Sequence, residues 1–211
     1  MANNMSKADL VASLKDSLHD AAKVFAVDGA EPDAAFERFL AQALPDMQTK
    51  CPATRLGSVQ LTANFPRYSL GNVAGFAAFK AQVWGDARPY KPWEPSYPGI
   101  LPRVMASHEA GQWWLEFDPA PTARHLAAYG SKFDFWYFGQ HSIGALATDT
   151  TVALQHRGLL LLRAQVEAMR ELSIRNAAKP VQLRDGFTGA PRNSTPIALA
   201  ESLMRAFVEA R

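Results

Sequence analysis

The chain has 211 residues, of which 22 are Lys or Arg and 20 are Asp or Glu, so its formal net charge is only +2 at pH 7. This balance excludes a strong overall field that would steer the protein to nucleic acid or to an anionic membrane. A single cysteine, Cys51, excludes an intrachain disulfide, and the longest aliphatic block, at 159–162, is far too short to span a bilayer. The first residues lack a secretory pattern, so we expect a cytoplasmic protein that is not a membrane protein.

Two amphipathic helices are predicted in the first fifty residues. Ser6 and Asp9 have the spacing of a capping box, and apolar residues at helical spacing follow them, which predicts one helix over about 7–26. A second helix is predicted over about 33–48. Pro45 should bend this helix without ending it, because the apolar phase continues beyond the proline.

Alternation of period two replaces the helical period from 54 to about 140, which predicts a β region. In the strand expected at 76–84, the face that holds Phe79 and Val83 should be buried. The strand expected at 132–138 has large rings on both faces, so both faces should be covered. Further strands are predicted at 58–63, 103–107 and 112–117, and a short helix at 122–129.

Five prolines between 88 and 102 exclude a central strand there. This segment should be an extended loop, ordered by the packing of Tyr90, Trp93 and Tyr97.

The longest predicted helix covers about 155–176. One arc of it is apolar and should face the core, whereas the opposite arc is charged. Leu160 and Ile174 project from within the charged arc, where a monomer would leave both in water. We therefore expect this arc to be a contact between subunits, formed by Leu160, Arg163, Glu167, Arg170, Glu171 and Ile174.

The last part of the chain, 177–211, is predicted to be an arm that ends in a helix at 195–209. Apolar residues cover half the circumference of that helix, so it must dock on another surface. We expect it to dock on a partner or a neighbouring subunit and not on its own bundle. The docking residues are expected to be Lys179, Arg184 and Arg192 along the arm and Leu199, Leu203, Met204, Phe207 and Val208 on the helix.

The order of these elements predicts an α+β fold. Four main helices should form a bundle, with a mainly antiparallel β unit inserted at about 54–140. We expect a single domain over 1–176, followed by the extended arm and docking helix at 177–211.

No catalytic, metal or cofactor site is predicted. Ser142 lies between Gly139 and Gly144, but the glycine that a nucleophile elbow needs two residues before the serine is replaced by Gln140. Cys51 follows a lysine that could lower the pKa of its thiol, although a lone cysteine at a helix end is more often inert. The histidines at 19, 108, 125, 141 and 156 lack the spacing of a metal site.

Several segments, taken in their joint order, resemble the head–tail adaptor, or connector, proteins of tailed bacteriophages. These segments are the two opening helices with ALPD at 43–46, VQLTA at 59–63, GFAAFKAQVWG at 75–85, WEPSYPGILPRV at 93–104, DPAPTARHLAAYGS at 118–131, RGLLLLRAQVEAMREL at 157–172 and PRNSTP at 191–196. The β part is larger than in minimal adaptors of this family and could mark a sub-branch with an added surface.

The resemblance implies a structural virion protein without catalytic activity. It implies a homo-oligomeric ring of twelve copies in the neck of the virion, assembled in the host cytoplasm beneath the portal protein. The ring would be a platform for the tail or the next adaptor, and DNA would pass through it without sequence-specific binding. Two alternatives from other classes remain at this stage: a carbohydrate- or peptide-binding module that uses the aromatic β region, and a small hydrolase that uses Ser142 or Cys51.

Overall fold

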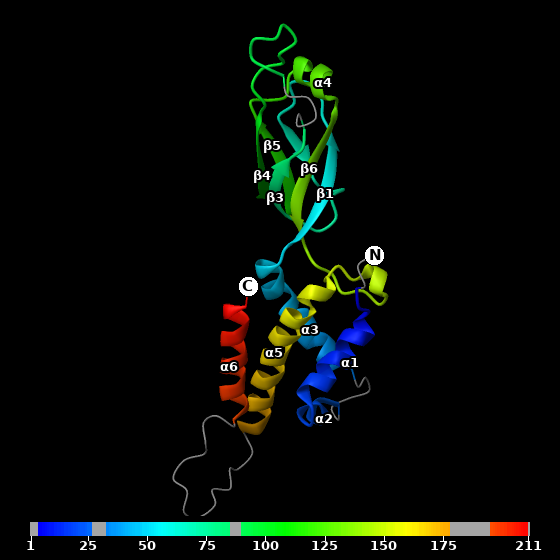
Figure 1. Cartoon of the computed structure of the whole chain (residues 1–211), viewed down its shortest axis with the longest axis vertical. Coiled ribbons are helices and arrows are strands. Elements are labelled where there is room, and N and C mark those ends of the chain that lie inside the picture. The colour runs from blue at the N-terminus through cyan, green and yellow to red at the C-terminus, as the bar shows by residue number, and fades with distance from the viewer. Residues whose placement is uncertain (1–3, 27–32, 85–89, 178–194, 211) are drawn as a thin grey trace, which may run out of the picture. The chain divides into compact units, whose positions relative to one another are not determined.

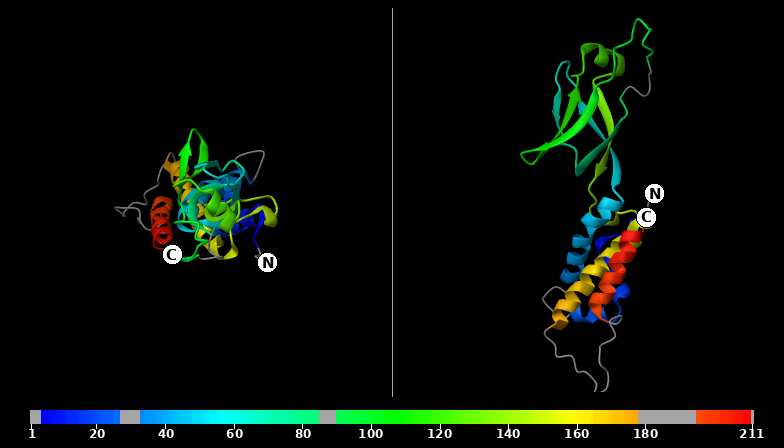
Figure 2. Two further views of the ribbon diagram at one scale, coloured as in Figure 1. Left: turned by 90° about the horizontal axis from the view of Figure 1, so that it is seen from above. Right: turned by 90° about the vertical axis from the view of Figure 1, so that its left-hand side faces the viewer.

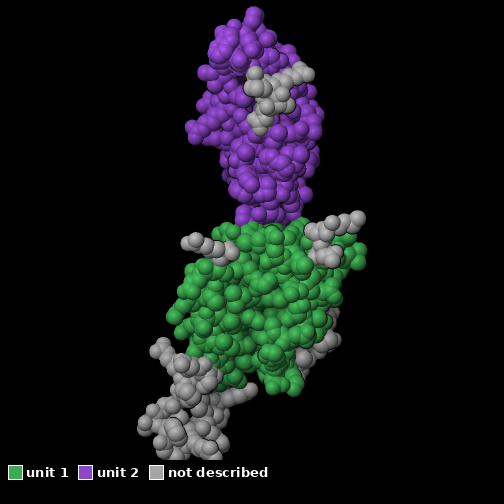
Figure 3. Space-filling model, in the orientation of Figure 1, with its two compact units in different colours: residues 1–51, 141–211 green, residues 52–140 purple. Residues whose placement is uncertain are grey.

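The computed structural model of the chain describes residues 4–26, 33–84, 90–177 and 195–210 (Figure 1). It confirms the predicted α+β class, with helices in one part of the chain and antiparallel strands in another. The chain divides into two compact units, which Figure 3 distinguishes by colour. The helical unit comprises residues 1–51 and 141–211, and the β unit comprises residues 52–140.

The helical unit is built around α5, Arg157–Ala177, which packs against helices on several sides (Figures 1 and 2). Its core contains apolar side chains of α5 and of the helices around it, among them Leu14, Phe36, Phe39, Met47, Val166 and Ala200. The other helices of this unit are α1, Lys7–Leu18; α2, Ala21–Ala26; α3, Ala34–Lys50; and α6, Pro196–Glu209, with short 3-10 turns at Ala147–Asp149 and Leu154–His156.

The prediction of one helix over 7–26 is wrong, because the chain breaks at His19. The predicted capping box is present. The Ser6 hydroxyl accepts a hydrogen bond from the Asp9 amide, and the Asp9 carboxylate accepts one from the Ser6 amide, both at 3.2 Å. The helix that it starts ends at Leu18, where His19 adopts a positive φ of 50° and donates its N–H to the Asp16 carbonyl. The apolar period continues across this turn, so periodicity alone does not reveal the break.

The prediction that the second helix continues past Pro45 is confirmed, since α3 extends to Lys50. Proline has no N–H with which to continue the helical ladder. Four residues further on, the Thr49 hydroxyl donates a hydrogen bond to the Pro45 carbonyl, at 3.1 Å. The apolar face of α3 is then complete on both sides of the proline, with Phe39 and Met47 both buried.

The β unit contains two three-stranded antiparallel sheets, with strand orders β1-β6-β3 and β2-β5-β4. Buried rings from both sheets form one core, in which Phe117 of β5 meets Phe133 of β6 with ring centroids 4.9 Å apart. The strands are β1, Ala53–Gln60; β2, Arg67–Ser69; β3, Phe76–Gln82; β4, Arg103–Glu109; β5, Gln112–Asp118; and β6, Lys132–Gly139, and the predicted short helix is α4, Ala123–Tyr129, capped by Thr122.

The predicted hairpin between β4 and β5 is confirmed, and its turn is tighter than expected. Glu109 pairs with Gln112, so only Ala110 and Gly111 form the turn. Both have positive φ, of 49° and 81°. A two-residue turn of this kind matches the twist of the strands that it joins.

The predicted buried face of β3 is confirmed only in the middle of the strand. Ala77 and Phe79 are half-buried there, and Phe79 packs against the core of the β unit. The fully buried residues, however, are Phe76 and Trp84, which alternation assigns to the opposite face. The pairing of β3 with β6 shifts register twice, between Phe76 and Ala78 and between Phe79 and Ala81. Each irregularity changes which side of the sheet the following side chains occupy, so strict alternation fails.

Two aromatic residues that were expected to be covered are exposed. Trp136 of β6 remains exposed on the outer face of its sheet, and Trp93 in the proline-rich loop is 77% exposed. In the same loop, the Tyr90 ring packs edge-on against Tyr129 of α4, with centroids 5.6 Å apart. Of the three expected anchors, Trp93 therefore does not anchor the loop.

Candidate assembly surfaces

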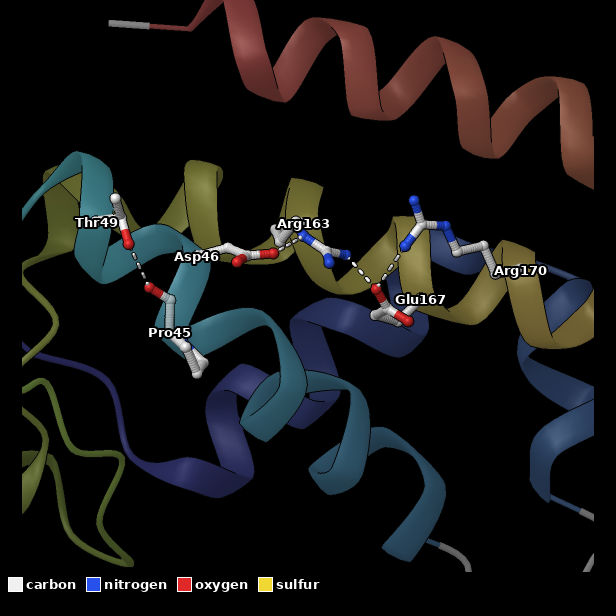
Figure 4. A network of polar contacts seen from close by, with 6 residues as sticks. All are labelled: Pro45, Asp46, Thr49, Arg163, Glu167 and Arg170. Atoms are coloured by element: carbon white, nitrogen blue, oxygen red, sulfur yellow. Dashed lines mark hydrogen bonds and ion pairs between the residues drawn. The ribbon is translucent and has the colours of Figure 1, made fainter.

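The charged arc of α5 faces α3 of the same unit (Figure 4). The Arg163 Nε donates to the Asp46 carboxylate at 2.6 Å, and its Nη1 donates to Glu167 at 2.5 Å. Arg170 donates to the same Glu167 oxygen at 3.1 Å. Four charges on two helices thus form one continuous network within the unit.

This network corrects the predicted subunit interface. Leu160 is 0% exposed and Arg163 is 7% exposed, so neither is available to another subunit. The reason is that α3 packs along the charged arc, and Asp46 supplies the opposite charge that a buried guanidinium needs. The sequence does not by itself identify Asp46 as the partner of Arg163. The one feature that points to Asp46 is its place in the ALPD segment, directly after the proline.

The environment keeps Arg163 charged. Burial by itself lowers the pKa of the Arg163 guanidinium, but the hydrogen bonds and charges of Glu167 and Asp46 outweigh burial and raise its pKa above the ordinary value. A permanently charged group at this position can be tolerated only while its carboxylate partners remain in place.

The end of α5 retains part of the predicted surface. Glu171 accepts hydrogen bonds from Arg38 of α3 and from Arg175, one turn further along α5. Beside this ion pair, Ile174 is 74% exposed, as predicted. A large apolar side chain so fully in water is the residue of the predicted set best placed to contact another molecule.

The C-terminal helix packs on its own bundle, contrary to prediction. The helix packs along α5, and the middle of its apolar arc, formed by Ala200 and Phe207, is buried. Ala200, Leu203 and Met204 join the core of the helical unit. At its end, the Lys50 ammonium donates to the carbonyls of Val208 and Ala210, at 2.7 and 2.8 Å, and lies 5.1 Å from the centre of the Phe207 ring. These contacts tie the C-terminal ends of α3 and α6 together and satisfy carbonyls that a helix end leaves free.

Both flanks of the same arc remain in water. Ile197 and Leu199 are each 46% exposed and Val208 is 60% exposed, whereas Leu203 and Met204 are half-buried at the edges of the contact with α5. The apolar arc of α6 is therefore wider than the surface that α5 covers. The arm residues Lys179, Arg184 and Arg192 lie outside the described residues.

A groove of about 200 Å³ lies in the helical unit between α1 and α3. Most of its lining residues are apolar, and the other two, Lys7 and Glu37, form an ion pair 2.8 Å long. The residues that line the groove are Lys7, Glu37, Leu40, Ala41, Leu44 and Ile143.

Ser142, which was considered as a nucleophile, and His141 beside it make structural contacts. The Ser142 hydroxyl donates to the Asp149 carbonyl, at 3.2 Å. The two ring nitrogens of His141 lie 2.7 Å from the Cys51 carbonyl and 3.2 Å from the Thr151 carbonyl, so this imidazole links two loops. Among the residues that the structure describes, no three His, Cys, Asp or Glu side chains gather where they could hold a metal ion.

The aromatic rings of the β unit chiefly serve its core. Phe133 and Phe135 are fully buried, and the Trp114 ring is covered by the Arg67 guanidinium, 4.5 Å from its centre. Open hollows of about 330 and 440 Å³ do occur in this unit, the first of them beside Tyr90 and Tyr97. Among the described residues, the exposed Phe and Trp rings of this unit are Phe65, Trp93 and Trp136, which belong to three separate segments.

No model of a known protein family matches the chain, and no curated protein matches it. Among solved structures, the chain is similar to a protein in the neck of an empty GTA particle, computed with C6 symmetry. The match covers 96% of this chain and 94% of that one, at 15% sequence identity and a TM-score of 0.26. A score of this size does not establish a common fold.

Within the described ranges, no helix is long and apolar enough to cross a membrane.

Proposed function

We propose that this protein is a structural subunit of the neck of a tailed-phage-like particle, where copies of it form a ring adaptor between the portal and the tail. The observation that carries the proposal is the apolar surface left in water on the helical unit, at Ile174 of α5 and on both flanks of α6. Exposed apolar patches of this kind on a well-packed unit mark surfaces that contact other proteins.

Of the segments that resemble the adaptor family, those in the helices support the proposal, because they form the frame of the helical unit. RGLLLLRAQVEAMREL is most of α5, and the ALPD segment supplies Asp46, the partner of Arg163 on that helix. PRNSTP ends in Thr195 and Pro196, the cap and the first residue of α6. The resemblance thus falls on residues that hold the bundle together and so shape its outer surface.

A native mass measurement of the purified chain tests the proposal. We expect a defined multiple of 23.1 kDa at sufficient concentration, in keeping with a closed ring. A chain that stays monomeric both alone and in the presence of a portal would contradict the proposed function.

Ile174→Asp is expected to weaken assembly while leaving the subunit folded. Burial of this side chain in each subunit contact would contribute about 2 kcal/mol, repeated around the ring, and a charge there would oppose the contact. The thermal midpoint of the monomer should hardly change, because the residue is 74% exposed. Ile174→Leu is the matched control and should assemble normally. Unchanged assembly of Ile174→Asp would remove Ile174 from the interface.

A further inference from the structure

One flank of α6 presents a mixed stripe to solvent. Ile197, Glu201, Arg205 and Val208 follow one another at spacings of four, four and three residues, so they lie on one side of the helix. All four are exposed, and Ala200 and Phe207 on the neighbouring side are buried against α5. We call these four residues the outer stripe. It has an apolar residue at each end and two opposite charges between them.

The groove between α1 and α3 has the complementary character. Leu40, Ala41, Leu44 and Ile143 give it an apolar floor. Lys7 and Glu37 pair across it, and both side chains are 41% exposed, so each retains capacity for a further charged partner. The groove therefore offers a hollow for an apolar side chain and one charge of each sign.

We propose that the outer stripe of one copy docks in the groove between α1 and α3 of a second copy. The two surfaces share no residue, and α6 and α1 lie on opposite sides of α5 in Figure 1. A contact between two different surfaces of the same chain is head-to-tail, and repetition of such a contact closes into a ring when the rotation permits. This inference rests on the proposed ring function and specifies one contact between copies, in addition to the contact proposed at Ile174.

Charge and length fit this pairing. Glu201 can meet Lys7, and Arg205 can meet Glu37, so both new pairs are attractive and both reinforce the ion pair already present. The stripe from Glu201 to Val208 and the groove side of α3 from Glu37 to Leu44 each cover eight residues, so about 10 Å of helix separates the first residue from the last. Val208 would then lie over the apolar floor near Leu44.

Helix direction fits it as well. Lys50, at the end of α3, binds the carbonyls of Val208 and Ala210 at the end of α6, so these two helices run parallel within one unit. Rotation about a ring axis along the bundle leaves unchanged the direction of any helix that runs parallel to that axis. The α6 of one copy therefore meets the α3 of the next in the parallel sense, which is the sense that brings Glu201 to the Lys7–Glu37 pair and Val208 to Leu44.

Pairwise cross-linking of cysteine variants tests the contact. In a chain with Cys51→Ser, one preparation contains Ala41→Cys and another contains Val208→Cys, both at exposed positions. With a short bismaleimide, the mixture of the two should give a covalent dimer, and the chain with both changes should give a ladder of multimers. Each single variant alone should give no dimer. A dimer from Val208→Cys alone would indicate a symmetric contact between α6 helices and would overturn the proposal.

Matched controls use exposed neighbours outside the two surfaces. Gln42→Cys replaces Ala41→Cys, and Ser202→Cys replaces Val208→Cys; neither should cross-link. Without a cross-linker, Val208→Glu should weaken self-association by about tenfold or more, whereas Ser202→Glu should leave it unchanged. Oligomers that form normally without the mixed cross-link would overturn this contact and leave the ring function standing. The absence of any oligomer would overturn both.

Discussion

Replacing Asp46 with alanine is expected to lower the free energy of unfolding of the helical unit by about 2 kcal/mol, because it removes one carboxylate from a buried guanidinium. The Arg163 side chain is only 8% exposed, and its Nε would lose its hydrogen-bond acceptor. Glu167 would still pair with it, which keeps the loss below that of a buried charge with no partner. Denaturant unfolding followed by the circular dichroism of the helices measures the change.

A double-mutant cycle separates the charge from the packing. Arg163→Met keeps much of the side-chain volume and removes the charge, so Asp46→Ala should cost far less in that background than in the native chain. Glu167 retains Arg170 as its partner in both cases. If Asp46→Ala lowers the free energy of unfolding equally in the two backgrounds, the ion pair between Asp46 and Arg163 does not stabilise the contact between α3 and α5.

Gly144→Ala is expected to destabilise the same unit by about 3 kcal/mol. An added methyl group would lie 2.2 Å from the Cβ of Asp149 and 3.0 Å from its carbonyl carbon, so the backbone itself would have to move. Hydrogen bonds hold this loop in place: the Gly144 carbonyl accepts from the Lys7 amide at 3.0 Å, and the Gly144 amide donates to the Thr150 hydroxyl at 3.1 Å. The thermal midpoint should fall by several degrees.

Gly158→Ala is the matched control for this change. Gly158 is the second residue of α5, and nothing lies within 4 Å of the position that its methyl group would take. Alanine has the higher helix propensity, so this substitution should stabilise the chain slightly, by up to about 1 kcal/mol. Equal effects of the two substitutions would show that the loop around Gly144 can relax, and that the close contact with Asp149 does not constrain it.

The loop around Gly144 also bears on assembly. Lys7, whose amide donates to the Gly144 carbonyl, and Ile143, which precedes this glycine, both line the groove between α1 and α3. A loop displaced by Gly144→Ala would alter the shape of that groove. We therefore expect any loss of self-association in this variant to accompany its loss of stability, whereas Val208→Glu affects self-association alone.

Much of the secondary structure follows from the sequence by itself. The capping box of Ser6, the cap at Thr195 before Pro196, the helix through Pro45 and the β4–β5 hairpin were all predicted and are present. Each depends on contacts within a few residues, such as a side chain that accepts a neighbouring amide or a glycine that supplies a positive φ. The α+β class follows as well, because helical and alternating patterns are segregated along the chain.

Only the tertiary structure decided which surfaces are inside. The charged arc of α5 has the pattern of an exposed face, yet Asp46, more than a hundred residues earlier in the chain, pairs with Arg163 and allows α3 to cover that arc and Leu160 with it. The same holds for α6, which docks on α5 of its own unit. Periodicity specifies that a face is apolar or charged, but not which element covers it. That choice depends on the free energy of contacts between distant segments, and no local pattern records it.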